Sequence, residues 1–105
     1  MLTRKSGLQK EVLALYRRAL RMVYSKPESN RPKFLLFVRY TFHTNASTIS
    51  PRNVSAIEHV LRKGARQIEM YESPAVKDCW VSDEMLAWEN GLESRSTSGH
   101  TVKKY

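Results

Sequence analysis

The chain has 105 residues, enough for one compact domain and too few for two domains of ordinary size. Hydrophobic residues make up 41% and charged residues 27%, which is typical of a globular protein and excludes a collagen-like or wholly disordered chain. The longest uncharged apolar run is Phe34–Val38, far short of the roughly 18 residues that span a bilayer, so we expect no membrane span.

The single cysteine, Cys79, excludes a disulfide framework or a cysteine-only metal cluster within one chain, and it fits a reducing compartment. The apolar residues near the start of the chain are spread among polar ones and do not form the apolar core of a secretory signal.

Positive charge is concentrated in the first three quarters of the chain. Residues 1–77 carry 15 lysine and arginine residues against five acidic residues, whereas residues 78–105 carry three against five. Such a charge attracts an acidic partner, which could be a nucleic acid, an anionic membrane surface or an acidic protein.

The first predicted helix begins at the capping box Ser6–Gln9 and ends near Ser25, because Lys26 precedes a proline. Its apolar residues recur every three or four positions, as on the buried face of an amphipathic helix. They are Leu8, Val12, Leu15, Ala19 and Val23, with Leu13, Tyr16 and Leu20 at the edges. Lys10, Arg17 and Arg21 lie on the opposite side.

The second predicted element follows Asn30 and Pro32, which suit a helix start. Its residues 34–42 fit either the alternation of a strand or the spacing of a helix. We favour a helix, because the sequence offers no second strand for pairing. Residues 45–49 are expected to form a polar loop.

The third predicted helix has the clearest pattern. Ser50 and Pro51 suit its first positions, and Ser73–Pro74 ends it. Its apolar face consists of Val54, Ile57, Leu61, Ala65 and Ile68. The opposite face is basic and includes His59, Arg62, Lys63 and Arg66, with Arg52 at its start. Because this face lacks interspersed acids, it favours an acidic partner over a merely solvated surface.

Gly64 lies in the middle of the third helix, where glycine costs about 1 kcal/mol relative to alanine. Either a neighbouring helix packs closely against it, or a partner approaches the backbone there. Both interpretations are consistent with the sequence.

The chain therefore divides into a helical domain, residues 1–74, and a C-terminal extension, residues 75–105, with a weaker pattern. Trp80, Met85 and Trp88 could belong to a short packing segment or helix. Residues 94–100 are polar and are expected to be disordered. The predicted fold class is an all-α, three-helix bundle with a partly ordered C-terminal tail.

The sequence contains none of the common nucleotide-binding, zinc-hydrolase or nucleophile motifs. His43, His59 and His100 are too far apart in the chain to suggest a metal site. Cys79 has no neighbouring base, which favours a small packing residue over a nucleophile. We expect neither an enzyme nor a chain that binds a metal or another cofactor itself.

Leu15-Tyr16-Arg17 near the start of the first helix, followed by Phe42, resembles the LYR-motif family of small helical mitochondrial proteins. The stretches Ile57-Glu58 and Leu61–Gln67 are similar to the branch of this family that assists assembly of respiratory complex II, succinate dehydrogenase. The resemblance covers about residues 6–72 and implies an LYR-type three-helix bundle.

This resemblance implies a chaperone of the mitochondrial matrix that binds the iron–sulfur subunit of succinate dehydrogenase. It would support cluster insertion before that subunit joins the flavoprotein, and the client would carry the iron–sulfur clusters. Leu15, Tyr16 and Arg17 would contact the J-type co-chaperone of iron–sulfur transfer, with Phe42 as an associated motif residue. The client-binding residues would be Arg52, His59, Arg62, Lys63, Gly64 and Arg66.

Two alternatives remain open at this point. Other family members bind acylated acyl carrier protein, so the chain could be such an adaptor for another mitochondrial complex. A small basic nucleic-acid-binding domain is the second alternative, but the aromatic residues lie mainly at apolar positions and offer no stacking surface, so we expect no nucleic acid among the partners.

Overall fold

A computed structural model of the protein describes residues 7–96. It contains the α-helices α1 (Gly7–Tyr24), α2 (Arg31–Thr48), α3 (Val54–Glu72) and α4 (Asp83–Ser96), with a short 3-10 helix, η1 (Glu28–Asn30), before α2. The all-α prediction is confirmed, and within residues 7–96 there is no strand. The structure has four α-helices rather than the three of the predicted bundle, because part of the C-terminal extension, for which the sequence left a short helix open, forms α4. No helix in this range is sufficiently long and apolar to cross a bilayer.

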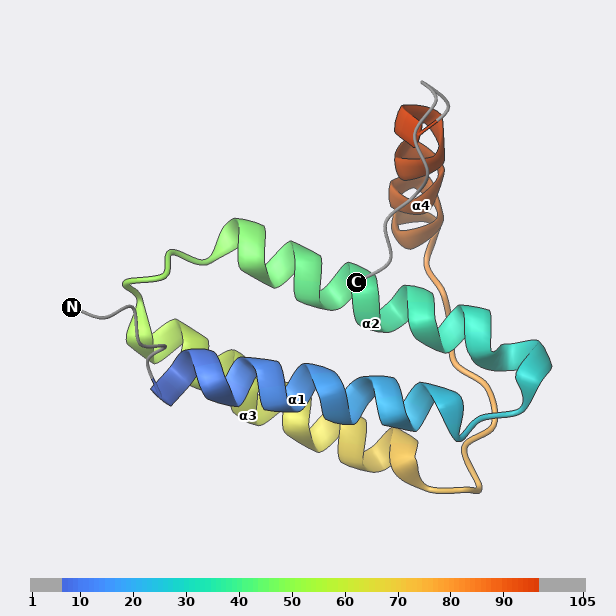
Figure 1. The fold of residues 1–105 in the computed structure, drawn as a ribbon, viewed down its shortest axis with the longest axis horizontal. Helices are drawn as coiled ribbons and strands as arrows, with labels where there is room; N and C mark the ends of the chain where they lie inside the picture. Colours follow the sequence, from blue (N-terminus) through green and yellow to red (C-terminus); the bar gives the residue numbers. More distant parts are fainter. Residues whose placement is uncertain (1–6, 97–105) are drawn as a thin grey trace.

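Helix α1 lies at the centre of the fold and packs against both α2 and α3. Helix α2 runs antiparallel to α1, and α3 runs in the same direction as α1 (Figure 1). Helix α4 contacts α2 and projects away from the other three helices. The molecule measures 42 × 40 × 23 Å. Its shortest dimension is about two helix diameters, so the fold is flat.

The core is small and is built mainly from α1 and α2. One buried cluster joins α1, α2 and α3 through Ala19, Met22, Val23, Phe34, Val38 and Ile68. Tyr71 of α3 closes the cluster with edge-to-face ring contacts to Phe34 and Phe37, at centroid distances of 5.7 and 5.4 Å. The cluster contains some of the expected apolar residues of each predicted helix, including Ala19 and Val23 of α1 and Ile68 of α3. Val54, which was expected on the apolar face of the third helix, is 50% exposed.

Helix α2 is longer than predicted and continues through the expected loop to Thr48. The hydroxyl groups of Ser47 and Thr48 donate hydrogen bonds to the backbone carbonyl of Thr44. These side chains therefore bond within the helix, as serine and threonine can when they point back along it.

Helix α3 begins later than predicted. Ser50 and Pro51 lie in a turn, in which the Ser50 hydroxyl accepts from the backbone N–H of Arg52. Asn53 is the N-cap, and its side-chain oxygen accepts from the N–H of Ala56 at 3.1 Å. Asparagine is among the preferred residues for this position. Arg52 is consequently in the turn before α3. The predicted end at Ser73 is confirmed.

The segment between α3 and α4 is tied to the connection between α1 and α2. Lys26 is only 3% exposed, and its ammonium group donates to the carbonyls of Ser73 (3.1 Å) and Val76 (2.6 Å). The Asn30 side chain donates to the carbonyl of Lys77, and Lys33 forms an ion pair with Asp78. The start of the C-terminal extension is thus held in place by side chains 45 to 50 residues earlier in the chain.

Helix α4 begins at a conventional N-cap. The Ser82 hydroxyl accepts from the backbone N–H of Met85 at 3.1 Å. Asp83 and Glu84 occupy the first turn, where negative charge interacts favourably with the helix dipole. The helix extends to Ser96, into the part of the chain expected to be disordered, and residues 97–100 lie outside the described residues.

Candidate partner-binding site

The Leu15-Tyr16-Arg17 motif lies on α1 between its two neighbouring helices. Successive residues of an α-helix point about 100° apart, so the three side chains have different surroundings. Leu15 packs toward α3, Tyr16 packs toward α2, and Arg17 is exposed. Leu15 and Tyr16 therefore contribute to packing between helices, and Arg17 is available to contact a partner.

Tyr16 and Phe42, 26 positions apart in the sequence, are in direct contact. Their ring centroids are 4.9 Å apart and the ring planes form an angle of 76°, a favourable edge-to-face arrangement. Burial raises the pKa of the Tyr16 hydroxyl, while the nearby charge of Arg39 opposes this shift. The structure thus brings Phe42 to the motif with which the sequence associated it.

Gly64 lies where α3 meets α1. A methyl group at this position would be 3.3 Å from Cδ2 of Leu15, closer than most such contacts in proteins. The structure therefore supports the first interpretation of Gly64, close packing of a neighbouring helix, because Leu15 of α1 lies against it. Gly64 is on the side of α3 opposite the basic face, because it is about 150° around the helix from the centre of that face.

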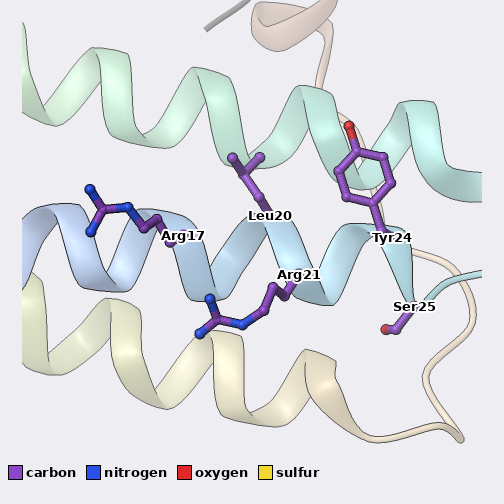
Figure 2. A pocket seen from close by; sticks show the side chains of 5 residues that line it. All are labelled: Arg17, Leu20, Arg21, Tyr24 and Ser25. Carbon is purple, nitrogen blue, oxygen red and sulfur yellow. The ribbon is translucent and has the colours of Figure 1, made fainter.

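Beside the motif, the outward side of α1 forms a shallow groove of about 530 Å³ that is open to solvent. Figure 2 shows its lining residues Arg17, Leu20, Arg21, Tyr24 and Ser25. Arg17 and Arg21 are one helical turn apart, as are Leu20 and Tyr24. Tyr24 is 63% exposed. The groove therefore combines two arginines with a leucine and an exposed aromatic ring.

The basic face of α3 is exposed to solvent. His59, Arg62, Lys63 and Arg66 are all exposed and share one side of the helix, with exposed Arg52 in the turn before it. Among residues 7–96, none of these side chains forms an ion pair. By contrast, Arg18 on the inner side of α1 forms a bidentate pair with Glu72 of α3, with both N–O distances 2.8 Å. The α3 basic face thus keeps its charge available for a partner.

Sequence reasoning missed the role of Lys26 and left open whether Trp88 belongs to a short packing segment or a helix. Lys26 precedes a proline at a helix end, where a basic side chain commonly reaches the last carbonyls of its own helix, so the sequence does not indicate its bonds to the carbonyls of Ser73 and Val76. Trp88 packs on α2 and anchors α4. The N-cap Ser82 followed by two acids was the available signal for α4.

No group of three or more histidine, cysteine or acidic side chains in the described part of the chain is arranged to hold a metal ion. Cys79 is half-buried, and burial together with the charge of Asp78 raises its pKa to about 11. Such a thiol is almost entirely protonated at neutral pH, which makes it a poor nucleophile.

Comparison with known families gives a match between residues 10–70 and the family described as Complex 1 protein (LYR family). The matched region contains the whole Leu15-Tyr16-Arg17 motif, Phe42 and the entire basic face of α3. The chain belongs to the LYR family.

Among the curated proteins, this LYR protein is similar to mitochondrial succinate dehydrogenase assembly factor 1 from two yeasts. It is 44% identical to the Schizosaccharomyces pombe protein over 77 residues, which cover 73% of this chain and 96% of that relative. It is 37% identical to the Saccharomyces cerevisiae protein over 71 residues, which cover 68% of this chain and 89% of that relative.

The LYR protein also resembles succinate dehydrogenase assembly factor 1A, mitochondrial, of Dictyostelium discoideum. The two sequences are 42% identical over 73 residues, which cover 68% of this chain and 79% of that relative. No solved structure matches the chain.

Proposed function

We propose that this LYR protein is a mitochondrial assembly factor for succinate dehydrogenase that acts by binding and without catalysis. The observation that carries the proposal is the 44% identity across 96% of the S. pombe protein named succinate dehydrogenase assembly factor 1. Three relatives from different organisms are named succinate dehydrogenase assembly factor 1 or 1A, and each is described as mitochondrial.

The client in this proposal is the iron–sulfur subunit of succinate dehydrogenase, in the matrix, before that subunit joins the flavoprotein. The exposed side chains of Arg62, Lys63 and Arg66 support this assignment, because arginine forms strong bidentate hydrogen bonds with carboxylates on a protein surface. The iron–sulfur clusters belong to the client, and this chain covers the client while they are inserted.

Charge reversal on α3 tests the proposal directly. Arg62→Glu and Arg66→Glu are expected to reduce recovery of the iron–sulfur subunit with the tagged protein at least tenfold, because each places a like charge against the client's acids. Lys10→Glu, an exposed position on α1, is the control with the same charge change. Circular dichroism checks that every variant keeps its helicity. Equal recovery by all variants would contradict the assignment of the α3 face.

The second partner in the proposal is the J-type co-chaperone of iron–sulfur transfer, with Arg17 as its main contact in the motif. Arg17 is the one exposed side chain of the three, whereas Leu15 and Tyr16 are half-buried. Arg17→Ala should therefore weaken co-chaperone binding while stability changes by less than about 0.5 kcal/mol. Arg21→Ala is the matched control, since Arg21 lies one turn away. A larger loss of binding in Arg21→Ala than in Arg17→Ala would show that Arg17 is not the main contact for the co-chaperone.

The groove on α1 favours one second candidate, binding of acylated acyl carrier protein. Arg17 and Arg21 would meet acidic residues of the carrier beside the apolar surface of Leu20 and Tyr24. Native mass spectrometry of the purified protein distinguishes the candidates, because a bound carrier adds the mass of a small acidic protein with its acyl chain. A spectrum with the iron–sulfur subunit and no carrier would leave only the first candidate.

A further inference from the structure

An apolar side chain, Met70, lies on the same side of α3 as the α3 basic face. Successive residues of an α-helix are about 100° apart, so Met70 lies about 20° from Lys63 and about 40° from Arg66 around the helix axis. Arg62, Arg66 and Met70 are spaced four residues apart and form one row along the helix surface. Met70 therefore continues the α3 basic face toward the C-terminal end of the helix.

The side chain of Met70 is exposed although it is apolar. It is 54% exposed, whereas Ile68 on the same helix is 3% exposed and belongs to the buried cluster. Single exposed apolar side chains are common on protein surfaces, so exposure alone does not identify a site. The informative observation is that this apolar side chain lies among exposed cations.

The acidic residues nearest to the α3 basic face on its own helix lie away from Met70. Glu69 is about 100° from Met70 around the helix axis, and Glu58 is about 120° from it. Lys63 and Arg66 are exposed, and neither forms an ion pair with an acid in the range 7–96. The surface around Met70 is thus positively charged, which favours an acidic partner.

This combination of side chains suits an acidic protein better than a nucleic acid. Arginine and methionine are both enriched in the centres of protein interfaces. There an arginine binds a carboxylate through two parallel hydrogen bonds, and the flexible thioether of a methionine adapts to an apolar neighbour. A nucleic acid backbone is bound mainly through its charge, which the arginines alone would satisfy. The exposed methionine therefore distinguishes between the two classes of acidic partner.

We propose that Met70 belongs to the client-binding surface of α3 and packs against an apolar side chain that the acidic client presents beside its carboxylates. This inference rests on the proposed function, because it takes the client of the α3 basic face to be a protein. Exposed charges mainly accelerate association, whereas an apolar side chain that becomes buried in the complex slows dissociation. Met70 thereby helps to determine which acidic surface stays bound.

The test measures how much iron–sulfur subunit of succinate dehydrogenase is recovered with the tagged chain from cells that express both. Met70→Gln, which makes the side chain polar at similar length, should lower recovery at least about fivefold. Met70→Leu, which stays apolar at similar volume, should keep recovery within about twofold of the wild type. The matched control is Val54→Gln, which should behave as the wild type does. Val54 is on the same helix and is 50% exposed, but it lies about 160° around the axis from Met70.

Salt separates the apolar contact from the charged ones. The loss of recovery in Arg66→Gln should be smaller at about 0.5 M salt than at about 0.1 M, because salt screens exposed charges. The loss in Met70→Gln should be the same at both concentrations, since salt does not screen an apolar contact. A loss in Met70→Gln that shrinks with salt as that of Arg66→Gln does would overturn the apolar contact. Circular dichroism checks that every variant keeps its helicity.

The remaining outcomes separate this inference from the proposed function. If Met70→Gln recovers as much client as the wild type while Arg66→Glu does not, Met70 is no contact and the assignment of the α3 basic face stands. If neither substitution changes recovery, the client binds elsewhere and both assignments fail. Equal losses in Met70→Gln and Met70→Leu would reject an apolar contact. Recovery that disappears after nuclease treatment would replace the protein client with a nucleic acid.

Discussion

The ring of Tyr16 meets the ring of Phe42 edge to face, with 4.9 Å between the centroids. This contact joins the motif on α1 to the middle of α2, while Leu15 beside it contacts α3. A motif that appears in the sequence as a recognition element is thus also the point at which three helices are held together. Substitutions of the half-buried Leu15 and Tyr16 should therefore affect folding more than substitution of the exposed Arg17, which should mainly affect binding.

The Tyr16–Phe42 contact is expected to be worth about 0.5–1.5 kcal/mol beyond the apolar surface that it buries. Tyr16→Leu, Phe42→Leu and the double variant form a double-mutant cycle. The sum of the losses in unfolding free energy of the two single variants should exceed the loss of the double variant by that amount. Urea unfolding followed by circular dichroism provides the free energies. Strictly additive effects would show that the rings contribute through burial alone.

Gly64→Ala is expected to change the free energy of unfolding by less than about 0.5 kcal/mol. Alanine improves helix propensity by about 1 kcal/mol, but its methyl group would press on Leu15 Cδ2 at 3.3 Å. In a Leu15→Ala background the contact is absent, so the same substitution should become stabilising by about 0.5–1 kcal/mol. If Gly64→Ala has the same effect in both backgrounds, packing against Leu15 does not explain why position 64 is a glycine.

Lys26→Met should destabilise the protein by about 1–3 kcal/mol, because the carbonyls of Ser73 and Val76 lose their donor. Lys33→Met, in the first turn of α2, is the control. Lys33 is exposed, and its ion pair with Asp78 should be worth less than about 1 kcal/mol. Thermal or urea unfolding compares the two variants, and equal losses would contradict the special role of the buried ammonium group.

The same lysine predicts a pH dependence. Burial, with a smaller effect of Lys77, lowers the pKa of Lys26 in the folded protein below its ordinary value of 10.5. At a pH between the pKa of Lys26 in the folded protein and its pKa in the unfolded chain, the amine of the unfolded chain holds more protons than that of the folded protein. The free energy of unfolding therefore rises with pH in this range. The stability difference between the wild type and Lys26→Met should therefore widen as pH increases toward 10.5. A difference that narrows would mean that the site favours the charged amine.

Cys79 should react slowly with alkylating reagents. Its pKa of about 11 means that very little thiolate is present at pH 8, so iodoacetamide should modify the native protein at least about tenfold more slowly than the urea-unfolded chain. Because the unfolded thiol ionises first, the stability that it contributes is complete below its ordinary pKa of 9.0 and is lost as pH rises through about 11. Mass spectrometry of timed samples measures the rates, and equal rates would contradict burial of the thiol.

The periodicity of α1 and α3 was sufficient to predict both helices, because the apolar residues of each helix form one stripe. Helix α1 contacts both α2 and α3, but its buried residues belong to one cluster that it shares with these two helices. Helix α2 gave an ambiguous pattern for the opposite reason. Phe34 and Val38 face the core that it shares with α1, while Tyr40 and His43 face α4. A helix with neighbours on two sides carries apolar residues on both, which imitates the alternation of a strand.

Other features depend on contacts that no local pattern contains. The sequence identified Arg62, Lys63 and Arg66 as one exposed face, since helix geometry alone places them together. It could not show that Lys26 would be buried against carbonyls from residues 73 and 76, nor that Leu15 would be the neighbour of Gly64. These relationships require the register between α1 and α3, which tertiary packing decides.

The thin core has a consequence for the amount of this protein in the cell. Seven hydrophobic side chains among the described residues are buried, a small number for a chain of this length, so the margin between folded and unfolded states should be narrow. A partner present at 100 times its Kd adds about 2.7 kcal/mol to the stability of the folded form. Since unfolded chains are removed by proteases, the abundance of this protein should rise and fall with that of its partner.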